Sequence, residues 1–265
     1  MDGKKTAARG REPLQEAAKD LLRRLAAKYE TASFADGDPI GTLALAAEGA
    51  DVEALAFVAA ALSYGSRKQF IPKIAEIAAM AGGDVRSWVA GGGYGAEFRE
   101  GDGRSFYRLF SRGRMAAFFG VYRQILLDHG SLGAFLRERG AATGLAAVET
   151  VAAAFGGKAV PIVPKDATSA CKRLCMFLRW MVRDGSPVDK GLWSGWFDKR
   201  TLVVPLDVHV LRQAERLGLV PPGAGATMRT ALALTEKLGE AFPDDPCKGD
   251  FALYGLGVDE AAATR

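Results

Sequence analysis

The residues best placed to do chemistry lie in the segment Pro205-Leu-Asp-Val-His-Val-Leu-Arg212. Pro205 fixes the backbone where a helix is expected to start, and Asp207 lies in the first turn of that helix. Backbone N–H groups lack partners there and the helix dipole favours an anion, so a carboxylate is held in a defined place. Two interpretations remain open. Asp207 is either an ordinary helix cap, which is the commoner meaning of such a pattern, or a fixed negative charge used in catalysis.

The wider segment Val204–Leu219 resembles the Val-Asp-Thr-His-Val-x-Arg stretch of the helix-hairpin-helix DNA glycosylase superfamily, and it looks closest to the 8-oxoguanine branch. The match includes His209, Val210 and Arg212 and extends into the tail Arg216-Leu-Gly-Leu219. The resemblance implies that Asp207 is the catalytic carboxylate.

A second segment, Val163–Leu178, stands where the superfamily has a glycine-containing hairpin followed by an apolar helix. Lys165 and Ala167 replace the two glycines that let the backbone approach a DNA phosphate, so this sequence departs from the family there. In a gapless alignment the nucleophilic Lys of the family falls on Ser169, and Lys172 follows one helical turn later. The resemblance makes Lys172 the candidate amine. Its other interpretation is a lysine that contacts phosphate or water.

Two weaker similarities extend the resemblance along the chain. The segment Ala56–Gln69 looks like the family's early helix, whose following turn has polar side chains that fill the space left by a flipped base. The segment Pro246–Gly257 looks like the closing helix, which packs near the base pocket. The whole chain is also similar to a bacterial family of conserved proteins with no assigned activity, through the helix Lys172–Arg183 and the Pro-Leu-Asp-x-His segment.

The resemblance implies an enzyme that excises a damaged or modified base from double-stranded DNA in base excision repair, with an oxidised purine such as 8-oxoguanine favoured. The target base must leave the stack before its glycosidic carbon can be reached. A neutral Lys172 would form a Schiff base, which can lead to strand cleavage; otherwise water attacks and only the base is released. The resemblance implies no cofactor and no metal, and we expect a monomer. The implied DNA-binding residues are Tyr64, Ser66, Arg67, Lys68, Gln69, Lys165, Ser169, Arg173, His209 and Arg212, with Arg216 as a further backbone contact.

The elements that must position these residues are helices. Apolar residues recur three and four positions apart, which predicts an all-α fold of about ten helices, and the rarity of period-two alternation predicts at most a short strand pair. The resemblance divides one globular unit, residues 1–265, into a helical lobe of about 45–150 and a second lobe of about 1–44 plus 160–257, with DNA across the cleft between them. The predicted helices are Leu14–Tyr29, Asp51–Leu62, Phe70–Met80, Phe106–Phe110, Met115–Leu127, Leu132–Arg139, Leu145–Phe155, Ala170–Arg183, Pro205–Leu217 and Met228–Phe242.

The helix that carries Lys172 has an apolar face and a basic remainder. The apolar face predicts core packing for Leu174, Phe177, Leu178 and Met181. The basic residues off that face could follow a phosphate backbone: Lys172, Arg173, Arg179 and Arg183. Three tryptophans are interpreted as buried, with stacking on an extruded base as the alternative: Trp180, Trp193 and Trp196.

The distribution of charge points to a polyanionic partner. The chain has 265 residues with 35 Lys or Arg against 31 Asp or Glu, and 49% of its residues are apolar, which excludes intrinsic disorder as its main state. Residues 165–216 contain ten basic and six acidic residues, and residues 1–28 contain eight and four. Such basic stretches are typical of proteins that bind nucleic acid, although most charge runs are only a solvated surface.

Three cysteines, at positions 171, 175 and 247, are too few for a disulfide framework, and their spacing fits no zinc site. We expect Cys171 and Cys175 to be buried thiols.

No apolar stretch approaches the ~18 residues that a membrane span needs, and no apolar segment follows the basic start of the chain. We therefore expect a cytoplasmic protein associated with the bacterial nucleoid. Two other classes stay open beside the glycosylase: a DNA- or RNA-binding protein that keeps the fold without the activity, and a helical structural protein.

Overall fold

The computed structural model describes residues 13–47 and 49–263; the basic stretch at residues 1–12 lies outside this part. The described chain is mainly helical, which confirms the all-α prediction, and its only paired strands form one short antiparallel hairpin. The α-helices are α1 (Glu16–Tyr29), α2 (Ala50–Leu62), α3 (Arg67–Met80), α4 (Val85–Ala90), α5 (Arg112–His129), α6 (Leu132–Glu138), α7 (Gly144–Phe155), α8 (Lys172–Val182), α9 (Val208–Arg216), α10 (Met228–Gly239) and α11 (Lys248–Ala263).

The starts of several helices are fixed by polar side chains that accept hydrogen bonds from unpaired backbone N–H groups. Asp84 caps α4 through the N–H of Ser87, and Asp207 caps α9 through the N–H groups of His209 and Val210. Such a cap is worth about 1 kcal/mol to the helix it starts. Asp207 therefore has the structural role that its position in the sequence suggested, whatever else it does.

Two local predictions were wrong. The run Phe106–Phe110, expected to be helical, forms the hairpin β1 (Ser105–Tyr107) and β2 (Phe110–Ser111), with Arg108 at a positive φ of 50° in the turn. Five residues are too few for a stable helix, and the aromatic rings of Phe106, Tyr107 and Phe110 are buried by packing of the hairpin. Helix α4 was not predicted, because its six residues between glycine-rich segments show too little periodicity.

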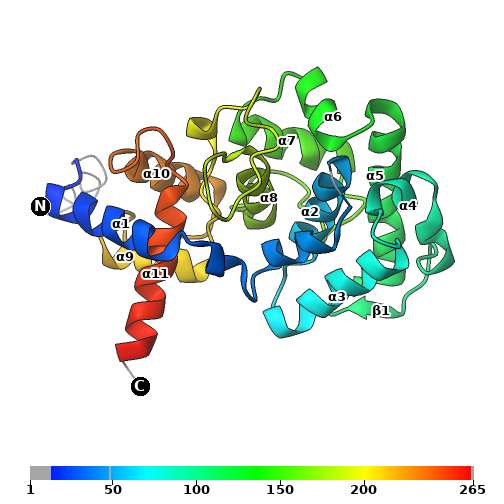
Figure 1. The fold of residues 1–265 in the computed structure, drawn as a ribbon, viewed down its shortest axis with the longest axis horizontal. Coiled ribbons are helices and arrows are strands. Elements are labelled where there is room, and N and C mark those ends of the chain that lie inside the picture. The colour runs from blue at the N-terminus through cyan, green and yellow to red at the C-terminus, as the bar shows by residue number, and fades with distance from the viewer. Residues whose placement is uncertain (1–12, 48, 264–265) are drawn as a thin grey trace, which may run out of the picture.

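The helices form two groups joined through α8 (Figure 1). In one group α1 packs along α11, and α11 packs on α9; in the other α2 contacts α3, α4 and α8, and α5 contacts α4, α6 and α7. Helix α8 was assigned by sequence to the lobe of α9 and α11, yet it packs against α2 and α7. One connected hydrophobic core includes buried residues from both predicted lobes.

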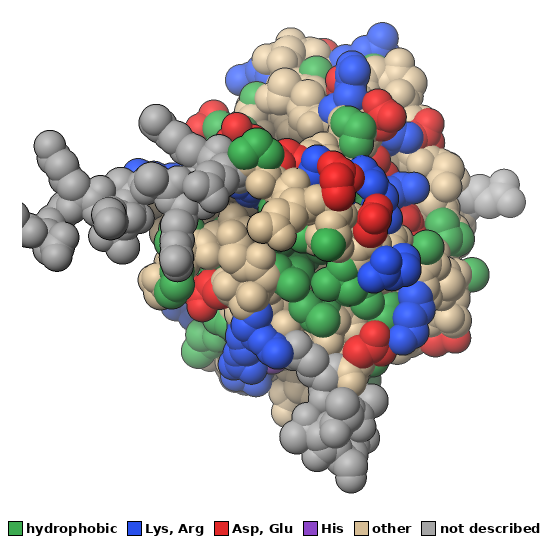
Figure 2. Space-filling model, turned by 90° about the vertical axis from the view of Figure 1, so that its left-hand side faces the viewer, with side chains coloured by type: hydrophobic (Ala, Val, Ile, Leu, Met, Phe, Trp, Pro, Cys, Tyr) green, Lys and Arg blue, Asp and Glu red, His purple; other side chains and the backbone are tan. Residues whose placement is uncertain are grey.

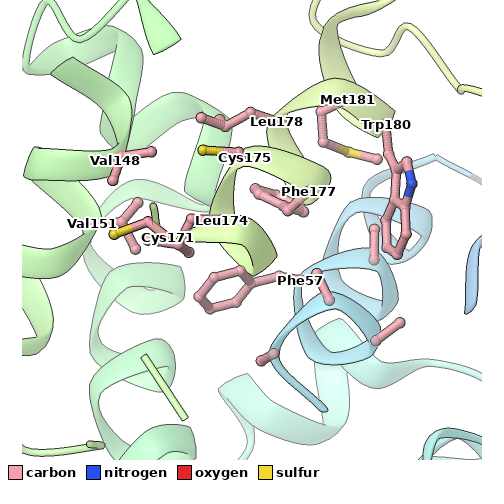
Figure 3. Packing of buried hydrophobic residues seen from close by; sticks show 14 of the residues in the cluster. Phe57, Val148, Val151, Cys171, Leu174, Cys175, Phe177, Leu178, Trp180 and Met181 are labelled. Carbon is pink, nitrogen blue, oxygen red and sulfur yellow. The ribbon is translucent and has the colours of Figure 1, made fainter. Parts of the chain in front are cut away.

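Helix α8 lies between α2 and α7 with its apolar side chains directed at both (Figure 3). The four residues predicted to form its core face are buried: Leu174, Phe177, Leu178 and Met181. The Phe177 ring meets the Phe57 ring of α2 edge to face, with 5.3 Å between centroids. Burying a side chain of this size contributes about 1.5–3 kcal/mol, so α8 is firmly seated. Cys171 and Cys175 are buried free thiols, as predicted.

The segment before α8, residues 156–171, is an irregular connector of turns and bends. Asp166 accepts hydrogen bonds from the N–H and hydroxyl of Thr168, and Ser169 pairs with Thr227 in an isolated bridge. Cys171, at a positive φ of 46°, turns the chain into α8. This turn places Lys172 at the first position of the helix.

Candidate functional site

A cavity of about 760 Å³ lies where helical faces of α8, α9 and α11 converge. Each helix contributes side chains spaced three or four residues apart, which is the spacing of one helical face. Helix α8 contributes Lys172, Met176 and Arg179; α9 contributes His209, Arg212 and Arg216; and α11 contributes Asp250, Tyr254 and Val258. Helix α11 packs on α9, and Gly257 of α11 faces Gln213 of α9: a Cβ at position 257 would lie 3.4 Å from Gln213 Nε2.

The centre of the cavity wall is an ion pair between the two residues that the sequence proposed as catalytic. Lys172 Nζ donates to Asp207 Oδ2 at 2.7 Å, and both residues line the cavity. The other carboxylate oxygen, Asp207 Oδ1, accepts from the N–H groups of His209 and Val210 at 2.9 Å each. The start of α9 thus holds the carboxylate in one orientation and leaves its second oxygen for the amine.

The surroundings of Asp207 keep it ionised. Burial acts to raise its pKa, but the charge and hydrogen bond of Lys172, together with the two backbone N–H groups, outweigh burial and hold the pKa below its ordinary value. Neither partner is sealed from solvent, because the Lys172 side chain is 41% exposed and that of Asp207 is 26% exposed. A half-open pair can exchange protons and meet a substrate.

Arginines surround the mouth of the cavity. Arg212 and Arg216 are exposed on α9, and Arg67 at the start of α3 pairs with Asp38 at 3.0 Å and lies over the Tyr254 ring. On the face shown in Figure 2, Lys and Arg side chains lie in several groups with acidic side chains between them. Positive charge is therefore local to particular sites on that face.

A second carboxylate lies at the base of the cavity. Asp250, in the first turn of α11, accepts a hydrogen bond from Arg179 Nη1, and its side chain is 14% exposed. Burial raises the pKa of Asp250, and the nearby charge of Asp207 raises it further; the charges of Arg179 and Lys172 oppose this rise. The cavity therefore holds two carboxyl groups whose pKa values are shifted in opposite directions.

Arg179 belongs to a buried ionic network behind the cavity. It lies 3.3 Å from Asp189, which also pairs with Arg183. Arg183, fully buried, pairs in addition with Asp245 and Glu30. Arg179 and Arg183 were predicted as residues that could follow a phosphate backbone, and this prediction was wrong. Both side chains are buried and paired with carboxylates.

The structure brings part of the predicted site together. Lys172, Asp207, Arg67, His209 and Arg212 line one cavity, together with Arg216. The remaining predicted DNA-binding residues lie outside it. Four are exposed around the turn that leads into α3: Tyr64, Ser66, Lys68 and Gln69. Lys165 and Ser169 are exposed on the connector.

Arg173 is also directed away from the cavity. Its guanidinium donates to the carbonyl oxygens of Ala61 and Pro161, and burial lowers its pKa to about 10. It ties the connector to the end of α2. Of the three tryptophans interpreted as buried, Trp180 and Trp193 are buried in the core, whereas Trp196 is only partly buried.

Sequence reasoning missed several residues that line the cavity: Phe34, Asp38, Arg179, Asp250 and Tyr254. Asp250 could have been predicted from the sequence. It is the acidic residue of Pro246–Gly257, the segment that resembles the closing helix near the base pocket. Asp38 and Phe34 belong to short 3-10 segments, whose place in the fold depends on tertiary packing.

Within the described residues, no group of three or more His, Cys, Asp or Glu side chains is arranged to hold a metal ion. The same part of the chain contains no helix with the length and apolar character needed to cross a membrane.

Comparison with protein families matches residues 38–259, most of the chain, to a family described as protein of unknown function (DUF2400). Comparison with curated proteins and comparison with solved structures found no match. The chain belongs to the DUF2400 family.

Proposed function

We propose that this protein is a DNA glycosylase that excises a damaged or modified base, with an oxidised purine such as 8-oxoguanine favoured as substrate. The observation that carries the proposal is the 2.7 Å pair of Lys172 Nζ and Asp207 Oδ2 on the wall of a cavity. The sequence resemblance assigns these two residues the roles of nucleophile and carboxylate, and they meet in the fold although they are 35 residues apart in the chain.

The cavity has the size of a small-molecule site. Its volume of about 760 Å³ lies within the ~300–1,000 Å³ of typical ligand pockets. Phe34 and Tyr254 give it aromatic surface on which an extruded base can stack. Arg67, Arg212 and Arg216 at its mouth supply the positive charge that a nucleotide's phosphates require.

The ion pair suits cleavage of a glycosidic bond. As this bond breaks, positive charge develops on the sugar, and a carboxylate fixed by two backbone N–H groups stabilises that charge without reorganising. Asp207 also accepts the proton that Lys172 must lose before its nitrogen can attack C1′. If water attacks instead, the same carboxylate orients it.

A second candidate is a DNA- or RNA-binding protein without catalysis. The observation that favours it is the connector 156–171, which lacks the two glycines of the family's phosphate-binding hairpin. Salt-sensitive binding of duplex DNA with no release of any base would support this candidate.

The direct test is covalent trapping. Wild-type protein is incubated with duplexes that each contain one oxidised or modified purine, borohydride is added, and protein–DNA adducts are separated by electrophoresis. We expect an adduct with wild type and none with Lys172→Gln. The matched control is Lys199→Gln, because Lys199 forms a similar pair with Asp184 at 2.6 Å and neither residue lines the cavity.

Base release without trapping would assign attack to water and keep the glycosylase proposal. Trapping that persists in Lys172→Gln would move the nucleophile to another amine. Neither release nor trapping from any duplex in the panel contradicts the proposal.

A further inference from the structure

Three aspartates line the cavity, Asp38, Asp207 and Asp250, and the last two lie in contrasting settings. Asp207 accepts two backbone N–H groups and the Lys172 ammonium, all of which favour its charged form. Asp250 has one charged donor, Arg179, and that donor is shared with Asp189. Asp207 therefore has three hydrogen-bond donors, whereas Asp250 has one.

The network behind Asp250 is short of positive charge. Two guanidinium groups, Arg179 and Arg183, serve four carboxyl groups in the described residues: Glu30, Asp189, Asp245 and Asp250. The side chains of all four acids are at most 14% exposed. A buried excess of two negative charges is costly, and retention of a proton relieves it.

Only Arg179 and Asp250 of this network line the cavity. Arginine does not give up its proton at ordinary pH, so Asp250 is the one member through which a proton of the network reaches a bound molecule. Burial, which raises the pKa of Asp250, acts in the same direction.

We infer that Asp250 is a further catalytic residue of this site, the acid that protonates the departing base. The inference rests on the proposed glycosylase function. It gives the two carboxyl groups separate tasks: Asp207 acts as the anion and Asp250 as the neutral acid, a division that enzymes obtain by placing similar groups in unlike environments.

The bond between C1′ and the purine nitrogen breaks, and its electron pair leaves with the base. Asp250 transfers its proton to a ring nitrogen of the purine, so the base departs neutral and Asp250 becomes a carboxylate. Before the attack, Lys172 transfers one proton of its ammonium group to Asp207, and the neutral nitrogen then forms the new bond to C1′, which leaves a secondary ammonium ion. Where water attacks instead, the proton that water loses passes to Asp207. Solvent in the cavity then returns Asp250 to its acid form and removes the proton from Asp207.

Charged groups of α8 and of the start of α9 act on Asp250. Arg179 and Lys172 approach from α8, and Asp207 approaches from the start of α9. Behind Arg179 lie Asp189 and, across the cavity, Asp38, both of which attract the guanidinium. These carboxylates weaken the hold of Arg179 on Asp250 and favour its protonated form.

The test compares two leaving groups under single-turnover conditions. One duplex contains the purine that wild-type protein excises, and the other contains a 2′-deoxyribosyl nitrophenolate, which departs as a stable anion without a proton. Asp250→Asn should slow purine release by about 100-fold or more, the usual contribution of a general acid, and nitrophenolate release by less than about threefold. With wild type, purine release should fall as pH rises and nitrophenolate release should not.

Asp245→Asn is the matched control, because it removes another carboxylate of the same network that does not line the cavity. It should lower stability without changing the ratio of the two rates. Equal slowing of both leaving groups by Asp250→Asn, or a wild-type pH profile shared by both substrates, overturns the acid role. The wild-type profile needs no variant, so a failure of Asp250→Asn to fold does not remove the test.

A direct measurement separates this inference from the proposed function. Isotope-edited infrared difference spectra of wild type and Asp250→Asn should show the carbonyl band of a protonated carboxyl group near neutral pH. Absence of the band overturns the acid role even if the protein is a glycosylase. Presence of the band in a protein that releases no base supports the protonation of Asp250 and places the failure in the proposed function.

Discussion

A basic residue lies at each end of helix α8, and one is partly exposed whereas the other is buried. Lys172 at the first position is 41% exposed and has Asp207 as its partner. Arg183, directly after the last turn and about 16 Å away at helical rise, is fully buried among Asp245, Asp189 and Glu30. The helix dipole opposes a cation at the first end and favours one at the second.

This difference in surroundings distinguishes a charge that can take part in chemistry, that of Lys172, from a charge that stabilises the fold, that of Arg183. A cation at a helix C-terminus with several carboxylates is held by every interaction around it, so its charge and position are fixed. A cation at a helix N-terminus, open to a cavity, keeps one partner and access to protons. Sequence alone shows both as basic residues off an apolar face.

The largest expected effect comes from breaking the buried end. Arg183→Met keeps an unbranched apolar stem but removes the guanidinium that Asp245, Asp189 and Glu30 share, which should lower the free energy of unfolding by about 3–5 kcal/mol. Urea unfolding followed by circular dichroism measures the change. Arg200→Met, which removes an exposed partner of Asp198, should leave the unfolding midpoint in place. A loss below about 1 kcal/mol for Arg183→Met would show that the network does not hold the fold.

The next effect concerns the open end and is functional. Asp207→Asn retains the cap, since Asn caps about as well as Asp, so stability should change by no more than about 1 kcal/mol. Base release should fall by about 10²–10³-fold, because a fixed charge in the site is lost. Single-turnover release and a thermal melt on the same samples measure both quantities.

Asp84→Asn is the control for that variant, since Asp84 caps α4 and does not line the cavity. It should melt like Asp207→Asn and release base at the wild-type rate. If the two variants release base equally well, Asp207 is only a cap, and the comparison of the two ends of α8 loses its functional side.

The smallest expected effect is on stability as a function of pH. The pKa of Asp207 is lowered by folding, so its contribution is present above the unfolded pKa of about 3.9 and is lost as pH falls through the lower folded value. The pKa of Asp250 is raised, so the folded state keeps a proton that the unfolded state releases, and stability falls as pH rises from about 3.9 through the folded value. Urea melts of Asp207→Asn and Asp250→Asn between pH 3 and 7 should therefore differ from wild type with opposite slopes. Parallel curves would mean that the two carboxyl groups share one environment.

Much of the fold could be predicted because long helices carry their own periodicity. The core face of α8 and the helices α1, α2, α5 and α7 follow from apolar spacing within single segments. The hairpin at Ser105–Ser111 and the short α4 could not be predicted, because tertiary contacts such as the hydrogen bond from the Tyr107 hydroxyl to the Tyr64 carbonyl decide short segments.

Residues of the site could be predicted from the sequence only where a single segment contains the whole motif. Asp207, His209 and Arg212 lie on one helix start, and the resemblance identified them together. Arg173 and Arg179 illustrate the limit. Both lie off the apolar face of α8, and only the position of α2, the connector and α11 determines that they bond to carbonyls or to Asp250 and not to solvent. The sequence of a helix determines on which side each residue lies. It does not determine which part of the fold packs against that side.

The positions of the aromatic residues decide which spectroscopic signal can follow the site. None of the four tryptophans lines the cavity in the described chain, and Trp180 and Trp193 are sealed in the core. Intrinsic tryptophan emission will therefore report unfolding but hardly respond to a base that enters beside Phe34 and Tyr254. A fluorescent purine analogue in the DNA places the reporter in the cavity itself, so its quenching would time base extrusion separately from the chemistry.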